Sequence, residues 1–255
     1  MILTTDSSHS TKSPNAKTNA APLHAALRLD QIRKCFTDFT VSADWSVQPG
    51  ERCALVGRSG SGKTTLLRVV AGLSDLTGPG DGGRVWLGDR DLTPLPPEKR
   101  NFGVVFQDQA LFPTLSVLEN AAFGLKIRGM GKAEREAEVL PWLERVGLKA
   151  RAQSGVERLS GGERQRLAFV RAFVWKPQAM LLDEPFSALD DGLRRTLRSE
   201  LVELHRLWPV PLLMITHDEA DLQAIAATQI AVQEEEGAGA RRFVKGTGIG
   251  EFGGA

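Results

Sequence analysis

The sequence contains no tyrosine and only two cysteines, and it has no apolar run near the roughly 18 residues that a membrane-spanning helix needs. Cys35 and Cys53 match neither a disulfide framework nor a metal-ligand spacing, so we expect two small apolar residues in a reducing cytosol. The N-terminus is polar at residues 6–10, where a signal peptide needs an apolar stretch. These absences predict a chain that meets a membrane only through another subunit.

The chain also lacks a large net charge of either sign. Lys plus Arg number 32 and Asp plus Glu number 31, which leaves a net charge of +1. This balance gives no electrostatic reason to expect nucleic acid or an anionic membrane as the main partner, and we expect no nucleic acid.

Apolar patterns along the chain predict an alternation of strands and helices. Residues 1–24 lack periodicity and indicate a disordered leader or a translation-start artefact. Apolar alternation begins at Leu27, and a glycine-rich turn at 78–83 is expected between strands. We expect strands at 52–56, 104–107, 179–183 and 212–216, and helices at 64–71, 117–127, 132–146 and 162–175. The pattern predicts an α/β core around a parallel sheet, interrupted by a helical insert.

A phosphate-binding loop follows the expected strand at 52–56. Its residues are Gly57, Arg58, Ser59, Gly60, Ser61, Gly62, Lys63 and Thr64, with Thr65 next in the helix. The glycines let backbone N–H groups approach a triphosphate, and the helix N-terminus adds partial positive charge. Lys63 would reach the β- and γ-phosphates, and the Thr64 hydroxyl would bind Mg²⁺. The alternative is a Gly/Ser-rich turn that contains Lys-Thr by chance, which the flanking strand and helix disfavour.

Two carboxylates end the expected strand at 179–183. Asp183 would face the same crevice as the loop and hold Mg²⁺, directly or through water. Glu184 is the candidate general base for the attacking water. Alternatively, Asp183, Glu184 and Pro185 form only a polar turn after a buried strand.

The octapeptide at 159–166, LSGGERQR, has two compatible interpretations. Ser160 and Glu163 form a capping-box pattern that starts a helix. Ser160 and the backbone N–H groups of Gly161 and Gly162 can also form a second anion site at that helix N-terminus. One γ-phosphate needs two such sites only if they meet across an interface.

Together with residues 179–185, these motifs resemble the ATP-binding-cassette (ABC) family over about residues 27–232. The resemblance implies an α/β fold: a P-loop NTPase core with parallel sheet, an N-terminal antiparallel β subdomain and an inserted α-helical subdomain. It places the ATPase domain at 25–245, with the helical subdomain at about 108–175. It also implies a head-to-tail homodimer, in which each ATP lies between the loop of one subunit and Ser160, Gly161 and Gly162 of the other.

Three further motifs take their roles from this resemblance. Gln107 matches the glutamine that reaches Mg²⁺ and the attacking water, and Ser187–Asp190 match a segment at the dimer interface. His217 matches the histidine at the γ-phosphate. Phe36 matches an aromatic residue that stacks on adenine, although a core phenylalanine on the strand after Ile32 is the alternative.

Residues 95–100, 106–108 and 110–113 are similar to the ATPase subunits of bacterial binding-protein-dependent importers, in the group that handles iron(III), polyamines, thiamine, sulfate or molybdate. The resemblance implies ATP and Mg²⁺ as cofactors. It also implies transmembrane permease subunits that dock at Leu111–Asn120, an extracytoplasmic solute-binding protein as an indirect partner, and a peripheral location on the cytoplasmic face of the inner membrane. Only 38 residues follow His217 (255 − 217), so we expect a tail at 246–255 and no C-terminal regulatory domain. Residues 226–228 and 242–247 match the family pattern poorly.

Three other functions fit the sequence less well than the ATPase subunit of an importer. A soluble ABC ATPase that remodels a protein or nucleic-acid complex usually has two cassettes or long inserted arms. A nucleotide-binding module with little turnover is disfavoured by Lys63, Asp183, Glu184 and His217. A P-loop kinase or GTPase would not need residues 159–166.

Overall fold

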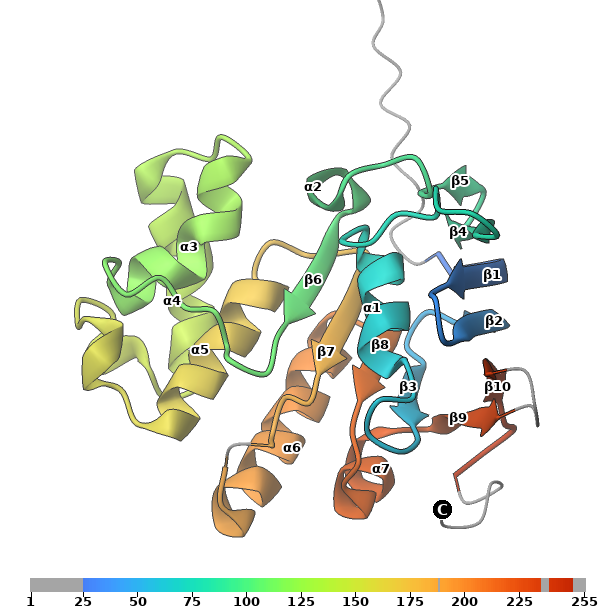
Figure 1. Ribbon diagram of the computed structural model, residues 1–255. Coiled ribbons are helices and arrows are strands. Elements are labelled where there is room, and N and C mark those ends of the chain that lie inside the picture. The colour runs from blue at the N-terminus through green and yellow to red at the C-terminus, as the bar shows by residue number, and fades with distance from the viewer. Residues whose placement is uncertain (1–24, 188, 235–238, 250–255) are drawn as a thin grey trace, which may run out of the picture.

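The computed structural model describes residues 25–187, 189–234 and 239–249, which form a mixed α/β arrangement around one sheet (Figure 1). In this part of the chain the sheet has ten strands, in the order β5-β4-β1-β2-β10-β9-β3-β8-β7-β6. The strands are β1 (Leu27–Cys35), β2 (Thr40–Val47), β3 (Arg52–Val56), β4 (Gly82–Leu87), β5 (Arg90–Asp91), β6 (Phe102–Val105), β7 (Ala179–Asp183), β8 (Leu212–Ile215), β9 (Thr228–Glu234) and β10 (Ala240–Lys245). The helices are α1 (Lys63–Ala71), α2 (Pro97–Arg100), α3 (Val117–Ile127), α4 (Lys132–Arg145), α5 (Gly161–Phe173), α6 (Asp191–Leu207) and α7 (Glu219–Ile225), with short 3-10 turns η1 (Lys149–Arg151) and η2 (Val156–Arg158).

Strands β9, β3, β8, β7 and β6 form the parallel half of the sheet. The strands β7 and β8 are apolar and buried along almost their whole length, because both faces of this half are covered. Met180 and Leu182 pack into the core made with α3, α5 and α6, whereas Ala179 and Leu181 pack into the core around α1. The carboxyl ends of these parallel strands meet at one edge of the sheet.

The other half of the sheet is antiparallel. Strand β1 pairs with β2 and β4, and β10 joins the halves by pairing parallel to β2 and antiparallel to β9. The apolar alternation of β1 is interrupted by Gln31, which has a φ of 49° at a shift in the strand register. Leu27, Leu29 and Ile32 are therefore all buried, although their spacing is not strictly two.

Helix α1 lies between the two halves of the sheet. Leu66, Leu67 and Val70 are fully buried, in the same core as residues of β1 and β7. The helix ends at Gly72, as the sequence predicts, because this glycine adopts a left-handed φ of 78° and its N–H donates to Val69.

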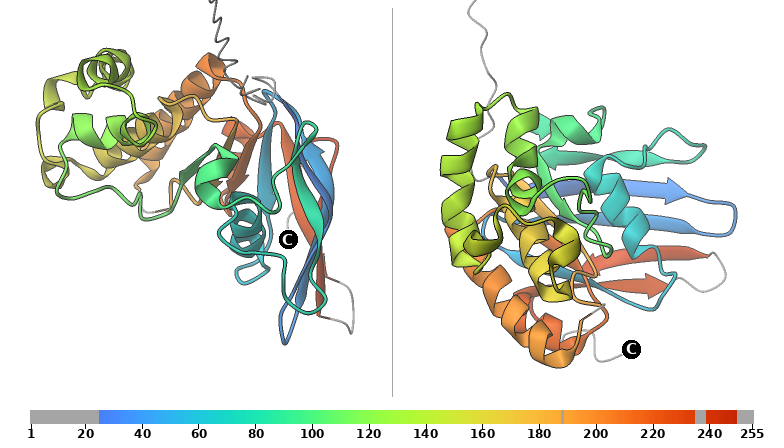
Figure 2. Two further views of the ribbon diagram at one scale, coloured as in Figure 1. Left: turned by 90° about the horizontal axis from the view of Figure 1, so that it is seen from above. Right: turned by 90° about the vertical axis from the view of Figure 1, so that its left-hand side faces the viewer.

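Helices α3, α4 and α5 form a group to one side of the sheet (Figures 1 and 2). The bounds of α3 are those predicted from the sequence, and α4 and α5 end one and two residues earlier than predicted. Both α3 and α5 begin with a complete capping box, so Ser160 and Glu163 do start a helix.

Two local predictions were wrong. Strand β6 spans Phe102–Val105 and not 104–107, because its pairing with β7 ends where Val105 faces Leu182 and the chain then turns. The glycine-rich turn at 78–83 does not lie between two strands: it follows α1, and Gly82 already starts β4.

The predicted leader at 1–24 and part of the loop at 234–239 lie outside the described residues. Among the helices that are described, none is long and apolar enough to cross a bilayer.

Candidate active site

The loop between β3 and α1 follows the path that its glycines permit. Gly62 precedes the first residue of α1 with a φ of 95°, and a Cβ atom there would lie 2.6 Å from Cγ2 of Val41 in β2. Gly57 has a φ of 147°, and its Cβ would lie 3.0 Å from Val232 in β9. A side chain at 62 would collide with β2, and one at 57 would be tight against β9 in a backbone conformation that favours glycine, so packing and backbone conformation as well as phosphate chemistry favour glycine at both positions.

The side chain of Lys63 lies within this loop and is 7% exposed. Its ammonium donates hydrogen bonds to the carbonyl oxygens of Gly57, at 2.7 Å, and Arg58, at 2.9 Å. Burial lowers the pKa of Lys63, and the negative charges of Glu184 and Asp183 oppose that shift. Among the other loop residues, Ser61 is buried, Gly57, Gly62, Thr64 and Thr65 are half-buried, and Arg58, Ser59 and Gly60 are exposed.

Thr64 and Asp183 meet beside the loop. The Thr64 hydroxyl donates to Oδ1 of Asp183 at 3.4 Å, across a sequence separation of 119 residues. Burial raises the pKa of Asp183, and the adjacent charge of Glu184 raises it further. A half-buried carboxylate beside a hydroxyl is a pair of hard oxygen donors that suits a small divalent cation.

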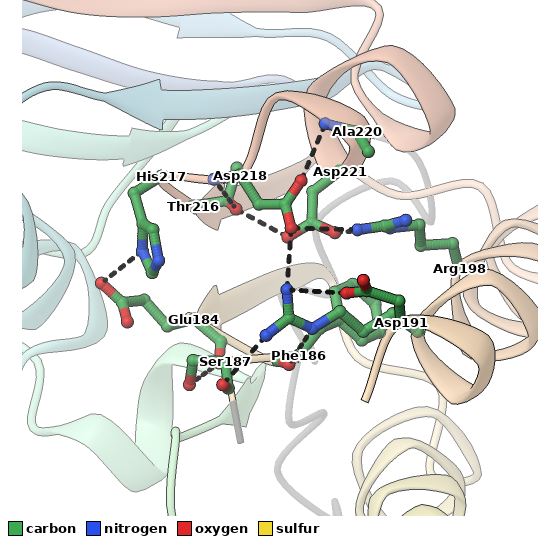
Figure 3. Close-up of polar contacts among 11 residues, drawn as sticks. Glu184, Phe186, Ser187, Asp191, Arg198, Thr216, His217, Asp218, Ala220 and Asp221 are labelled. Atoms are coloured by element: carbon green, nitrogen blue, oxygen red, sulfur yellow. Dashed lines mark hydrogen bonds and ion pairs between the residues drawn. The ribbon is translucent and has the colours of Figure 1, made fainter. Parts of the chain in front are cut away.

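Glu184 and His217 extend from the ends of neighbouring strands β7 and β8. His217 Nδ1 lies 3.5 Å from Oε1 of Glu184, and their side chains point toward each other (Figure 3). Glu184 adopts a left-handed φ of 45°, which costs a non-glycine residue roughly 1–2 kcal/mol. Hydrogen bonds from its N–H to Ile215, at 3.1 Å, and from the Ser187 hydroxyl to its carbonyl, at 3.1 Å, hold this conformation.

Gln107 lies in the exposed turn after β6, at the same edge of the sheet. Val105 pairs with Leu182, so Gln107 and Glu184 each lie two residues beyond this pair, on neighbouring strands. The structure therefore brings Lys63, Thr64, Asp183, Glu184 and His217 together, and Gln107 lies in the turn after the neighbouring strand β6.

A family model described as ABC transporter matches residues 41–187, which is more than half of the chain. The chain belongs to the ABC transporter family. This membership also agrees with the mixed α/β fold and its loop between β3 and α1.

Curated relatives in this family are import ATP-binding proteins. The sulfate/thiosulfate import ATP-binding protein CysA of Xylella fastidiosa (strain Temecula1) is 43% identical over 218 residues, covering 83% of this chain and 61% of the relative. The Fe(3+) ions import ATP-binding protein FbpC of Agrobacterium fabrum is 40% identical, covering 81% and 58%. The sn-glycerol-3-phosphate import ATP-binding protein UgpC of Ralstonia nicotianae is 42% identical, covering 79% and 55%. The chain spans about three fifths of the length of these relatives.

In this ABC chain Phe36 is 42% exposed, so the alternative of a core phenylalanine was wrong. Its ring stacks on Phe39, with centroids 4.6 Å apart. Phe39 also contacts Arg241 of β10, whose guanidinium lies 4.5 Å from the Phe39 ring centroid. The same guanidinium donates a hydrogen bond to the carbonyl of Gly60. Sequence reasoning missed Phe39 and Arg241. Phe39 carries no motif, and Arg241 reaches the loop across 181 residues.

The ABC segment Ser160, Gly161 and Gly162 begins α5, away from the loop between β3 and α1 within the same chain (Figure 1). The Ser160 hydroxyl accepts from the Glu163 N–H at 3.3 Å and is exposed. A Cβ on Gly162 would lie 2.7 Å from Leu193 of α6. Gly162 is therefore packed against α6, whereas Ser160 at the N-cap is exposed and Gly161 is half-buried.

Proposed function

We propose that this chain is the ATP-binding and ATP-hydrolysing subunit of a bacterial ABC importer. The observation that carries the proposal is the convergence of Lys63, the Thr64–Asp183 pair and the Glu184–His217 pair at one edge of the sheet. The names of the three curated relatives described above, each an import ATP-binding protein, support the same function.

Each of these residues has a distinct task in the proposed reaction. The backbone N–H groups of residues 57–65 and the Lys63 ammonium bind the phosphates of ATP. Glu184 accepts a proton from the attacking water at its carboxylate, and His217 contacts the γ-phosphate. Phe36 offers an exposed ring face for the adenine base.

Mg²⁺ fits the oxygen donors beside the loop. The Thr64 hydroxyl and the Asp183 carboxylate would hold the ion, with Gln107 at the neighbouring strand end. When bound, Mg²⁺ would neutralise charge that develops on the phosphate oxygens. Burial and the charge of Glu184 raise the pKa of Asp183, and a bound cation would oppose both effects by favouring the ionised carboxylate.

We infer that two copies of the chain pair head to tail around two ATP molecules, since α5 begins at the exposed Ser160, away from the phosphate-binding loop of its own subunit. In this scheme residues 25–245 form the ATPase domain, with residues 108–175 as its helical insert. The difference in ATP affinity between the open and closed dimers drives the conformational change.

The permease subunits would dock at Leu111–Asn120, and the solute-binding protein would act through them from the other side of the membrane. Buried Asn120 fixes this segment: its side chain accepts from the Phe112 N–H and donates to the carbonyls of Phe112, Leu115 and Ser116. Pro113 and Thr114 are consequently exposed on a fixed loop. The location would be peripheral, on the cytoplasmic face of the inner membrane.

A phosphate-release assay tests the hydrolytic function. We expect Mg²⁺-dependent ATP hydrolysis by the wild-type chain, and we expect Glu184→Gln to bind ATP within about twofold of wild type while its kcat falls at least 100-fold, because general-base catalysis contributes roughly 10²–10⁴-fold. Glu203→Gln is the matched control, since the side chain of this glutamate on α6 is 66% exposed and forms an ion pair with Arg206 of the same helix. Retained turnover in Glu184→Gln would refute the assignment of the base.

A further inference from the structure

A network of charged groups joins α6 to the loop that carries His217. The central residue of this network, Arg194, belongs to none of the motifs found in the sequence. Arg194 of α6 donates three hydrogen bonds that reach two other segments. We propose that Arg194 is a positioning residue, which fixes Glu184 and His217 relative to each other. This inference rests on the proposed function, because it assigns a role in the same hydrolytic site.

The first contact of Arg194 is with the backbone that follows Glu184. Its Nε donates to the carbonyl of Phe186 at 3.1 Å, and its Nη2 donates to the carbonyl of Ser187 at 3.2 Å. Ser187 in turn donates its hydroxyl and its N–H to the carbonyl of Glu184. The guanidinium therefore stabilises the turn that keeps Glu184 in its left-handed conformation.

The second contact is with the residue after His217. Arg194 Nη1 donates to Oδ2 of Asp218 at 3.0 Å, and Arg198 Nη2 lies 3.3 Å from the same oxygen. The other oxygen, Oδ1, accepts from the Ala220 N–H at 2.8 Å and caps α7. Burial opposes ionisation of Asp218, but the backbone N–H groups and the two arginines outweigh it and lower the pKa of this carboxyl.

Residue Thr216, on the other side of His217, is held as well. Its hydroxyl donates to Asp221 at 2.7 Å, and Arg198 donates to the second oxygen of Asp221. His217 thus lies between two fixed residues while its own side chain is 66% exposed. The backbone sets where the imidazole stands, and Arg194 links that backbone to the turn after Glu184.

Arginine suits this position because its planar guanidinium presents donors in fixed directions to three acceptors. A lysine ammonium could keep the ion pair with Asp218 but could not also bond both carbonyls. Helix α6 does not itself depend on these bonds, since its buried face consists of Leu197, Leu201 and Leu204 and its N-cap is Asp190. The three side-chain hydrogen bonds of Arg194 therefore go to the catalytic segments, and its one contact within α6 is an ion pair at 3.8 Å with the exposed Asp191 among the described residues.

The test compares Arg194→Gln, Arg194→Lys and the control Arg195→Gln, whose side chain is exposed on the next position of α6. For each full-length variant we would measure ATP hydrolysis, nucleotide affinity and the thermal midpoint. We expect Arg194→Gln to lower kcat roughly 10- to 100-fold, because displacement of catalytic groups by about 1 Å has effects of this size. Its ATP Kd should stay within about twofold of wild type, Arg194→Lys should recover part of kcat, and Arg195→Gln should match wild type.

Asp218→Asn provides a second route, because asparagine retains the cap of α7 while it removes the charge. If Arg194 acts partly through Asp218, the double variant should lose less than the product of the two single losses. Independent, multiplicative losses would overturn this link.

The remaining outcomes separate the two proposals. A hydrolysing wild type with Arg194→Gln at full kcat would overturn the role of Arg194 alone. Parallel loss of ATP binding and kcat in both Arg194 variants would show a merely structural residue and would overturn it as well. A wild type that binds but does not hydrolyse ATP would refute the proposed function and, with it, this inference.

Discussion

Single residues of the nucleotide loop differ in what requires them. Gly62 is needed for two physical reasons, a left-handed φ of 95° and a Cβ position only 2.6 Å from Val41. Gly60 has a similar φ of 76°, but a Cβ there would meet nothing within 4 Å. Glycine is thus required at position 62 by both packing and backbone conformation, and at position 60 by backbone conformation alone.

This difference leads to a prediction about stability without nucleotide. Gly62→Ala should reduce the free energy of unfolding by about 2–4 kcal/mol, since backbone strain and overpacking against Val41 add together. Gly60→Ala should reduce it by only about 1 kcal/mol. Urea unfolding of both variants gives the comparison, and equal losses would show that the contact with Val41 relaxes without cost.

At the scale of elements, α3 and α5 begin with the same capping box. Ser116 and Glu119 start α3, and Ser160 and Glu163 start α5, with reciprocal bonds in both cases. Burial on one face then completes each helix, with Ala121 and Leu125 in α3 and Leu167 and Val170 in α5. The capping chemistry alone therefore does not distinguish a helix start from a phosphate site.

A matched pair of substitutions distinguishes a serine that only caps a helix from one that also binds phosphate. Aspartate caps a helix about as well as serine, so Ser160→Asp and Ser116→Asp should each leave the stability within about 1 kcal/mol of the parent. In a Glu184→Gln background, Ser160→Asp should abolish ATP-dependent dimerisation, because its carboxylate would repel the γ-phosphate of the partner's nucleotide. Ser116→Asp should dimerise normally. Sedimentation velocity with and without ATP measures this, and a dimer of Ser160→Asp would contradict the head-to-tail arrangement.

At the scale of the whole molecule, the loop at 108–116 connects the sheet edge to the helical group. Arg171 of α5 donates to the carbonyls of Gln109 and Ala110, two consecutive residues with positive φ. Asn120 of α3 holds residues 112–116 through hydrogen bonds to Phe112, Leu115 and Ser116. Gln107 is thereby tied to α3 and α5, which is the connection that a subunit coupled to a membrane partner needs.

Affinity purification of the tagged chain from detergent-solubilised membranes of its native cell tests that partnership. We expect a stoichiometric multi-span membrane protein to co-purify with the wild-type chain. Thr114→Arg, on the exposed part of the proposed docking segment, should reduce its recovery at least tenfold, whereas Thr196→Arg on exposed α6 should not. A homodimer that hydrolyses ATP and brings no membrane protein would favour the remodelling ATPase instead.

Local chemistry made much of the site predictable from the sequence. Phosphate binding needs glycine, lysine and threonine at fixed spacing, and a carboxylate after an apolar strand has to lie at the sheet edge, so Lys63, Thr64, Asp183 and Glu184 could be named in advance. Helix bounds such as Val117–Ile127 followed from the helical pattern of the sequence.

Long-range packing decided the remainder. The contact between Thr64 and Asp183, the reach of Arg241 to Gly60 and the three bonds of Arg194 all join segments that no local pattern relates. Strand β10 inserts between β2 and β9, although it is the last described strand in the chain. Spacing along the chain thus determined which chemical groups are present, whereas only the pairing of distant strands and helices decided which of them touch.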